Sequence, residues 1–188
     1  MPETGSPAQL ERLPGPQADV VRAAFRELHG RRLHGFALLL TLGDRERAAS
    51  LASDALAAGQ LRVDELRHPE RAAAWLRRHV VQRAASVQAR RADTTGGPLM
   101  ELGVDAAIVS ALAALGRLER AALIAETIER LDRRDVGMVV GRRGAALDRL
   151  LHRARGSAIA AYGVTVDEGR PEGPIVARIR KVAGLALT

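Results

Sequence analysis

The stretch 131–155, LDRRDVGMVVGRRGAALDRLLHRAR, decides the expected fold. Asp132 is placed to cap a short helix, and Gly141 occupies the turn that follows it. Apolar residues on both sides of this turn recur at three- and four-residue steps, as they do on one face of a helix. The residues expected to face inward are Val136, Val139, Leu147, Leu151 and Ala154. The pattern predicts two short helices joined by a glycine turn, the outline of a helix-turn-helix.

The second of these helices is poorly equipped to read bases. Glycine and alanine at 144–146 cannot form bidentate contacts with base edges. Asp148 would repel phosphates, with His152 and Arg155 as its expected partners. The residues expected to hold a phosphate backbone here are Arg142, Arg143, Arg149 and Arg153.

The composition favours a polyanionic partner. The chain has 188 residues, a formal net charge of +7 and a single lysine, Lys181, and a basic excess of this kind is typical of nucleic-acid binding. Aromatic residues make up only 2% of the chain, which argues against stacking of single-stranded bases and favours packed helices with a Leu, Ala and Val core. There is no cysteine, so disulfides and thiolate metal sites are excluded.

The sequence predicts an all-α fold of two small helical domains joined by a short linker. We expect a disordered lead at 1–18, a helical domain at 19–91, a linker at 92–103 containing ADTTGGP, and a helix-turn-helix domain at 104–162. The tail at 163–188 could hold a short helix. The start of the chain is not a signal peptide, and the apolar run at 36–42 is too short to cross a bilayer. We therefore expect a cytoplasmic protein with no membrane partner.

The first domain should contain three helices. Gly43 and Asp44 are placed to end one helix and cap the next, and Pro69 suits the first turn of a long helix reaching residue 91. The inward stripe of the first helix is expected to be Val21, Phe25, Leu28, Phe36 and Leu39. The exposed faces of the long helix are expected to carry Arg71, Arg77, Arg78, Arg83, Arg90 and Arg91.

Enzyme chemistry is absent from the sequence patterns. The five histidines lack metal-ligand spacing, no serine lies in a nucleophile elbow, and no glycine run matches a phosphate loop. We therefore expect neither an enzyme nor a cofactor, a metal site or a small-molecule substrate.

Two blocks of the chain, in the right order, resemble one family. LLLTLGDRERAASLASDALAAG, followed by HPERAAAWLRRHVVQRAASVQARR, resembles region 2 of an extracytoplasmic-function sigma factor. ALAALGRLERAALIAETIERL, together with the stretch that ends in LHRAR, resembles region 4. The resemblance covers roughly residues 19–162. It implies a regulator of transcription initiation that binds the RNA polymerase core and promoter DNA, and an anti-sigma factor is a further possible partner.

The resemblance also assigns roles to residues. It places polymerase binding at SLASDAL, 50–56, through Leu51, Ser53, Asp54 and Leu56, although Ser53 and Leu56 depart from the family pattern. It places DNA contacts on the long helix, where Gln82 stands at the position of the family's asparagine.

Two alternatives stay open. The departures from the family pattern suit a degenerate sigma-like protein that binds another protein without reading promoters. The segment DVGMVVGRRGAALDRL also resembles the loop and following helix of a KH RNA-binding domain, in which Gly141–Gly144 would clamp the nucleic-acid backbone. A KH fold requires strands before that loop. The short linker further favours packing of the two domains on each other.

Overall fold

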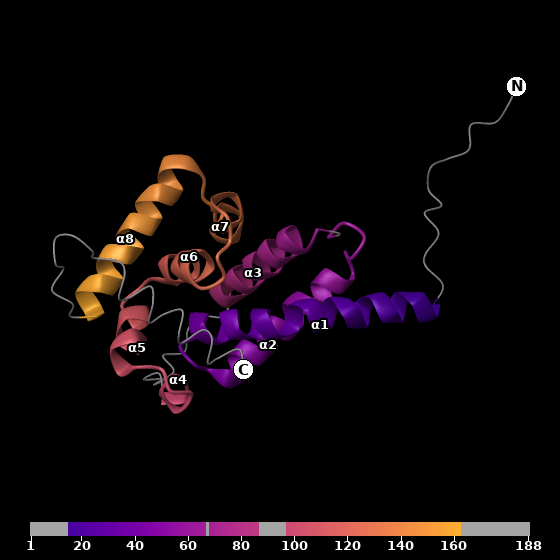
Figure 1. The fold of residues 1–188 in the computed structure, drawn as a ribbon, viewed down its shortest axis with the longest axis horizontal. Coiled ribbons are helices and arrows are strands. Elements are labelled where there is room, and N and C mark those ends of the chain that lie inside the picture. The colour runs from indigo at the N-terminus through magenta and orange to yellow at the C-terminus, as the bar shows by residue number, and fades with distance from the viewer. Residues whose placement is uncertain (1–14, 67, 87–96, 163–188) are drawn as a thin grey trace, which may run out of the picture.

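A computed structural model describes residues 15–66, 68–86 and 97–162, and every regular element in them is a helix (Figure 1). The prediction of an all-α fold is therefore confirmed for these residues. In chain order the helices are α1 (Gly15–Leu40), α2 (Arg45–Gln60), α3 (Pro69–Ser86), α4 (Gly97–Glu101), α5 (Ala106–Ala113), α6 (Arg117–Thr127), α7 (Arg133–Val140) and α8 (Gly144–Tyr162).

Helices α1, α2 and α3 pack together in the first half of the chain. The caps predicted from the sequence are present, because Gly43 has a φ of 91° and the Asp44 side chain accepts a hydrogen bond from the Arg47 backbone N–H at 2.9 Å. Pro69 begins α3, as expected. The N-terminal end of α1 extends past the other helices (Figure 1). Leu28 is 59% exposed although Phe25, nearer that end, is buried, so Leu28 lies off the covered face of α1, which contradicts its predicted place in the inward stripe.

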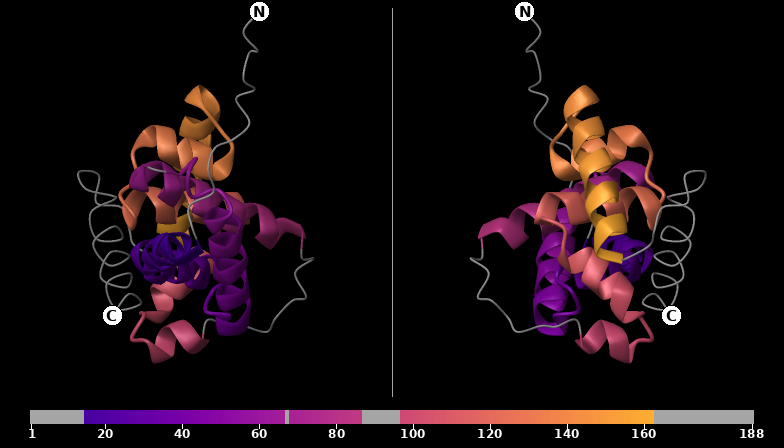
Figure 2. Two further views of the ribbon diagram at one scale, coloured as in Figure 1. Left: turned by 90° about the vertical axis from the view of Figure 1, so that its right-hand side faces the viewer. Right: turned by 90° about the vertical axis from the view of Figure 1, so that its left-hand side faces the viewer.

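Helices α5 to α8 form the second half, in which α6 packs against α7 and α8, and α5 packs against α8. Helices α7 and α8 are joined by a short turn and make the predicted helix-turn-helix. The five predicted inward residues, Val136, Val139, Leu147, Leu151 and Ala154, are all buried. Figures 1 and 2 both place α7 and the start of α8 at the opposite edge of the molecule from α4.

The two halves share one continuous core. Helix α3 packs on α7 and α6, and α1 packs on α6, so the buried residues of both halves form a single cluster. Arg120 on α6 ties the halves together by donating to the carbonyl oxygens of Leu40 at 2.7 Å, Leu112 at 2.7 Å and Leu115 at 2.9 Å. Burial lowers the pKa of Arg120 to about 10. The division into two domains stays a prediction, and their expected packing on each other agrees with this core.

Some predictions lie outside the described residues, namely the lead up to residue 14, the end of the long helix from residue 87, and the tail from residue 163. Helix α1 already begins at Gly15, within the predicted lead. The KH alternative is contradicted, because the described residues contain no strand and α5 and α6 occupy the segment where a KH fold needs strands.

Candidate nucleic-acid interface

The turn between α7 and α8 is held by local contacts that the sequence dictates. Asp132 caps α7 by accepting from the Asp135 backbone N–H at 2.8 Å, as predicted. Gly141 ends α7 with a φ of 66°, a left-handed conformation that glycine adopts without strain. The Arg142 N–H then donates to the Gly137 carbonyl at 3.0 Å. A Cβ on Gly137 would lie 2.6 Å from the Arg142 carbonyl oxygen, so the turn requires glycine at this position.

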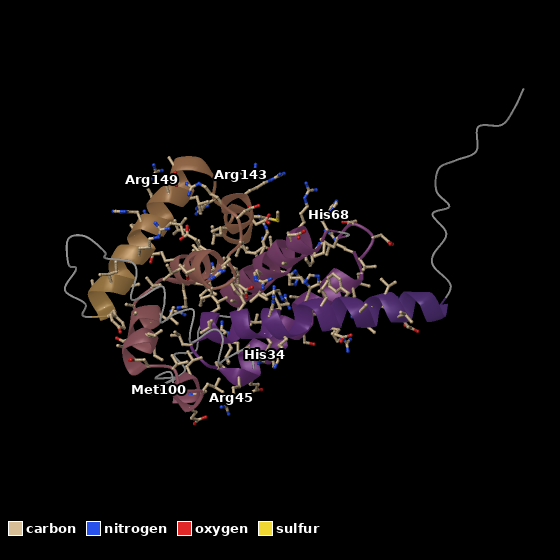
Figure 3. The ribbon with its side chains drawn as sticks, viewed as in Figure 1. His34, Arg45, His68, Met100, Arg143 and Arg149 are labelled. Carbon is tan, nitrogen blue, oxygen red and sulfur yellow. The ribbon has the colours of Figure 1, made fainter. Side chains whose placement is uncertain are left out.

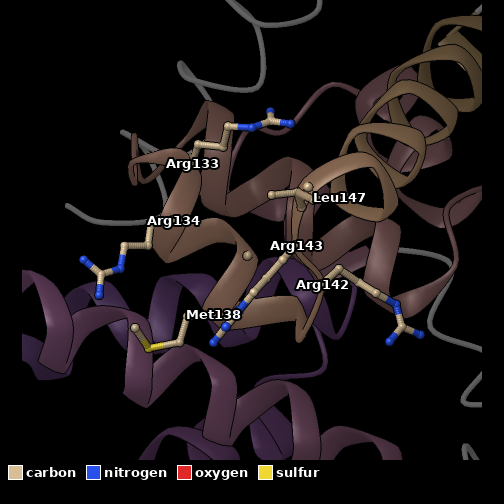
Figure 4. Close-up of a pocket in the computed structure, with 8 residues that line it drawn as sticks. Arg133, Arg134, Met138, Arg142, Arg143 and Leu147 are labelled. Atoms are coloured by element: carbon tan, nitrogen blue, oxygen red, sulfur yellow. The ribbon is translucent and has the colours of Figure 1, made fainter.

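Four arginines surround a hollow of about 570 Å³ at this turn. Arg133 and Arg134 come from the first turn of α7, and Arg142 and Arg143 come from the turn before α8. The rest of the lining is Gly137, Met138, Gly144 and Leu147. Figure 4 shows the four arginines arranged around α7 and the turn, with Met138 and Leu147 among them. We call this surface the basic hollow. Clustered guanidinium groups favour a polyanion, because they can neutralise several phosphates at once.

The predicted contact residues Arg142, Arg143 and Arg149 are exposed at this end of the molecule. Figure 3 shows Arg143 and Arg149 there, well separated from Arg45 and Met100 at the opposite edge. Among the described residues, these three arginines form no ion pair with an acid. Their charge is therefore available to a ligand.

The arginines further along α8 are engaged with α6. Arg153 is exposed but lies 3.5 Å from Glu119, and Arg155 pairs with Glu126 at 2.7 Å. A phosphate contact by Arg153 would therefore require breaking its ion pair with Glu119. Arg155 is not the partner of Asp148, contrary to the prediction.

Asp148 is neutralised within the helix-turn-helix. Its carboxylate forms an ion pair with Arg133 of α7, and not with His152 or Arg155. Both side chains of the pair are about half exposed. Asp148 therefore offsets one arginine of the basic hollow and leaves Arg134, Arg142 and Arg143 as its arginines without an ion pair among the described residues.

A second, smaller hollow of about 230 Å³ lies between the starts of α3 and α7 and has mixed charge. Its lining is His68, Glu70, Arg71, Asp132, Arg134, Asp135 and Met138. Burial and the charge of Asp132 raise the pKa of the Asp135 carboxyl, and Arg134 and Arg71 oppose this rise. Arg71 is exposed, as predicted, but it adjoins acids and not the basic hollow.

Most of the predicted DNA-contacting side chains that the structure describes on α3 form ion pairs or hydrogen bonds with other parts of the protein. Gln82 and Arg83 are exposed, but Arg83 lies 3.5 Å from Asp54 of α2. Arg90 and Arg91 lie outside the described residues. Of the predicted contacts on α3, Arg71 and Gln82 thus remain exposed and without an ion pair among the described residues.

Arg77 is buried, so the prediction that it lies on an exposed face of the long helix is wrong. It is 2% exposed and donates to Glu129 at 2.5 Å and to the Ala73 carbonyl at 2.9 Å. Its guanidinium also lies over the Phe36 ring, 5.7 Å from the centroid. Burial lowers the pKa of Arg77, and the charge and hydrogen bond of Glu129 counteract this. The physical reason for the error is the packing of α3 on the second half, which covers this face of the helix.

Arg78 is likewise turned toward protein. It is half-buried and donates to the carbonyl oxygen of Met138, at the end of α7, at 3.1 Å. Its expected role as a phosphate contact is therefore not supported by its position.

The structure separates the four residues implied in polymerase binding. Leu51 is only 4% exposed and Leu56 is half-buried against the core, so neither presents an apolar anchor to a partner. Ser53 and Asp54 are exposed, and Asp54 pairs with Arg83. This correction follows from the packing of α2, whose apolar face covers α1 and α3.

Arg134 is the interface residue that the sequence reasoning missed, together with its neighbour Arg133. The signal was present, because both follow directly after the predicted cap Asp132. In a helix-turn-helix the first turn of this helix lies beside the start of the next one, so cations at both places converge.

A metal site and a membrane span were each sought in the part of the chain that the structure describes. It contains no group of three or more His, Asp or Glu side chains arranged to hold a metal ion. None of its helices combines the length and apolar character needed to cross a membrane.

Comparison with protein-family models, with curated proteins and with solved structures finds no match to this chain. Its function is therefore inferred from the geometry and charge of its own residues.

Proposed function

We propose that this protein is a sigma-like regulator of transcription that binds promoter DNA through α7, the turn and α8. The observation that supports this most directly is the basic hollow, in which Arg134, Arg142 and Arg143 gather at the turn of a helix-turn-helix. In such motifs the start of the second helix enters the major groove, and the flanking residues hold the backbone. The role implies a cytoplasmic protein.

Binding should be dominated by phosphates and only weakly selective for sequence. The start of α8 offers Gly144, Ala145 and Ala146, which have no side-chain donors for base edges. Arginine contacts to phosphates give affinity that falls steeply with salt, and they carry little sequence information.

The RNA polymerase core is the second partner in this proposal. It rests on the resemblance to region 2, and Ser53 and Asp54 are the implied contact residues that remain exposed. With Leu51 buried, we expect this interface to be weak.

A second candidate is a sigma-like protein that docks on a protein and does not read promoters, for example on polymerase or an anti-sigma factor. The pairing of Asp148 with Arg133 favours it, since this pair reduces the charge available to DNA beside a helix start that lacks donors. Purification from native lysate distinguishes the candidates: polymerase together with promoter DNA supports the first, and a protein partner with no DNA supports the second.

Fluorescence anisotropy of a labelled promoter duplex at low salt tests DNA binding directly. The variant R142Q/R143Q removes two cations from the basic hollow, and R26Q/R32Q removes the same charge from exposed positions on α1. We expect the first variant to lose about tenfold or more in affinity and the second to lose little. Equal losses in both variants would show that net charge alone binds DNA, and the proposed interface would be wrong.

A further inference from the structure

Helix α3 contacts the connection that leads into α7 and the last turn of α7 through two consecutive arginines. Arg77 reaches Glu129, in the connection that leads into α7, and Arg78 reaches the carbonyl of Met138 in the last turn of α7. Between these two contacts α3 packs along α7. Two neighbouring residues of α3 therefore contact the chain before α7 and in its last turn.

The contact before α7 is buried and charged. The side chain of Glu129 is 7% exposed, and the Arg77 guanidinium is held in place by the Ala73 carbonyl and the Phe36 ring. Glu129 follows the end of α6, and the next residue, Arg130, has a φ of 52°. The direction in which the chain enters α7 is thus fixed from α3, because a buried ion pair cannot shift without leaving a charge unpaired.

The contact in the last turn of α7 lies directly before the turn that leads to α8. Carbonyls in the last turn of a helix lack intrahelical partners, and a guanidinium there is also favoured by the helix dipole. The Met138 carbonyl accepts from the Gly141 N–H at 3.4 Å and, as a second and shorter bond, from Arg78 at 3.1 Å, and the neighbouring Gly137 carbonyl accepts from the Arg142 N–H. The backbone that places Arg142 and Arg143 is therefore stabilised directly beside the Arg78 contact.

We propose that Arg77 and Arg78 are positioning residues for the DNA interface, and that they hold the connection into α7 and its last turn without touching nucleic acid themselves. The inference rests on the proposed function, since it names what sets the place of Arg142 and Arg143. It also gives α3 a role in which Arg77 and Arg78 contact protein.

The salt dependence of DNA binding separates a positioning residue from a phosphate contact. Each phosphate contact that is lost lowers the slope of log K against log salt by about 0.9 for duplex DNA. A positioning residue changes the affinity and leaves the number of contacts, and hence the slope, almost unchanged. R142Q should lower the slope, whereas R78Q should weaken binding by about tenfold, the equivalent of roughly 1.4 kcal/mol, at constant slope.

The experiment measures duplex affinity over a series of salt concentrations for the wild type, R78Q, R78K and R142Q, with R26Q on α1 as the charge-matched control. We expect R78K to recover part of the affinity, because lysine keeps a donor near the Met138 carbonyl, and R26Q to match the wild type. A slope reduced by R78Q as much as by R142Q would overturn the proposal, and so would an unchanged affinity. Urea unfolding of each variant confirms that the fold is retained.

Hydrogen exchange of the Arg142 amide tests the same inference without DNA. This amide is bonded to the Gly137 carbonyl, so its exchange should be faster in R78Q than in the wild type. The double variant R77M/E129L, which removes the buried charges together, should also accelerate it. If the wild type binds no duplex, the proposed function fails. The positioning role is then judged by this exchange alone, and unchanged rates in both variants would overturn it.

Discussion

Replacement of Arg77 by methionine should destabilise the protein severely. The substitution leaves the Glu129 carboxylate, 7% exposed, without its partner and also removes the bond to the Ala73 carbonyl. Breaking a buried pair from one side costs about 3–5 kcal/mol, which is a large part of the roughly 5–15 kcal/mol stability of an ordinary domain. The double variant R77M/E129L should recover most of this loss, because apolar residues of similar volume often replace a buried pair without cost.

Urea unfolding followed by circular dichroism measures these free energies by linear extrapolation. The control is R83M, which breaks the exposed pair with Asp54 and should change stability by no more than about 0.5–1 kcal/mol. If R77M also costs less than about 1 kcal/mol, Arg77 behaves as a surface residue. A double variant R77M/E129L no more stable than R77M would show that the unpaired Glu129 carboxylate is not the cause of the loss.

Three further substitutions test the packing around the interface. G137A should lose about 1–3 kcal/mol of stability in urea unfolding, because its Cβ would lie 2.6 Å from the Arg142 carbonyl oxygen; an unchanged midpoint would contradict this close approach. R120M should lose about 3 kcal/mol or more in the same assay, because three carbonyls lose their shared donor, and a loss below about 1 kcal/mol would contradict that role. Burial, and then the charge of Arg77, lower the pKa of His29 in the folded protein. As the pH falls, His29 is therefore protonated in the unfolded state before it is protonated in the folded state, so the free energy of unfolding should fall below about pH 6.5. This fall should be smaller in H29Q, and equal pH profiles would show that His29 titrates normally.

The local features of the fold could be predicted because they depend on a few neighbouring residues. Asp44 and Asp132 cap helices, and Gly43 and Gly141 end them, since each conformation is set by side-chain reach or by the absence of a Cβ. Leu28 shows where periodicity fails. The apolar pattern includes Leu28 in one face of α1, but Phe25, nearer the N-terminal end, is buried while Leu28 is exposed, so the covered face is narrower than the pattern indicates.

The roles of the arginines could not be predicted, because they depend on partners far away in the sequence. Arg77 is buried by Glu129, 52 residues further along the chain, and Arg78 finds a carbonyl 60 residues away. Arginines on a helix have the same spacing in the sequence whether they face solvent or the other half of the protein. Asp148 likewise pairs across the helix-turn-helix with Arg133 and not along its own helix.

The most direct test of the proposed interface is a map of backbone amide shifts in the ¹⁵N-labelled protein as a promoter duplex is added at low salt. We expect the largest shifts at Arg134, in the turn 141–144 and at the start of α8, with shifts on α1 and α2 near zero. The contradicting result would be shifts concentrated on α1 or α2 with the turn unchanged, because the duplex would then bind where the basic hollow is absent.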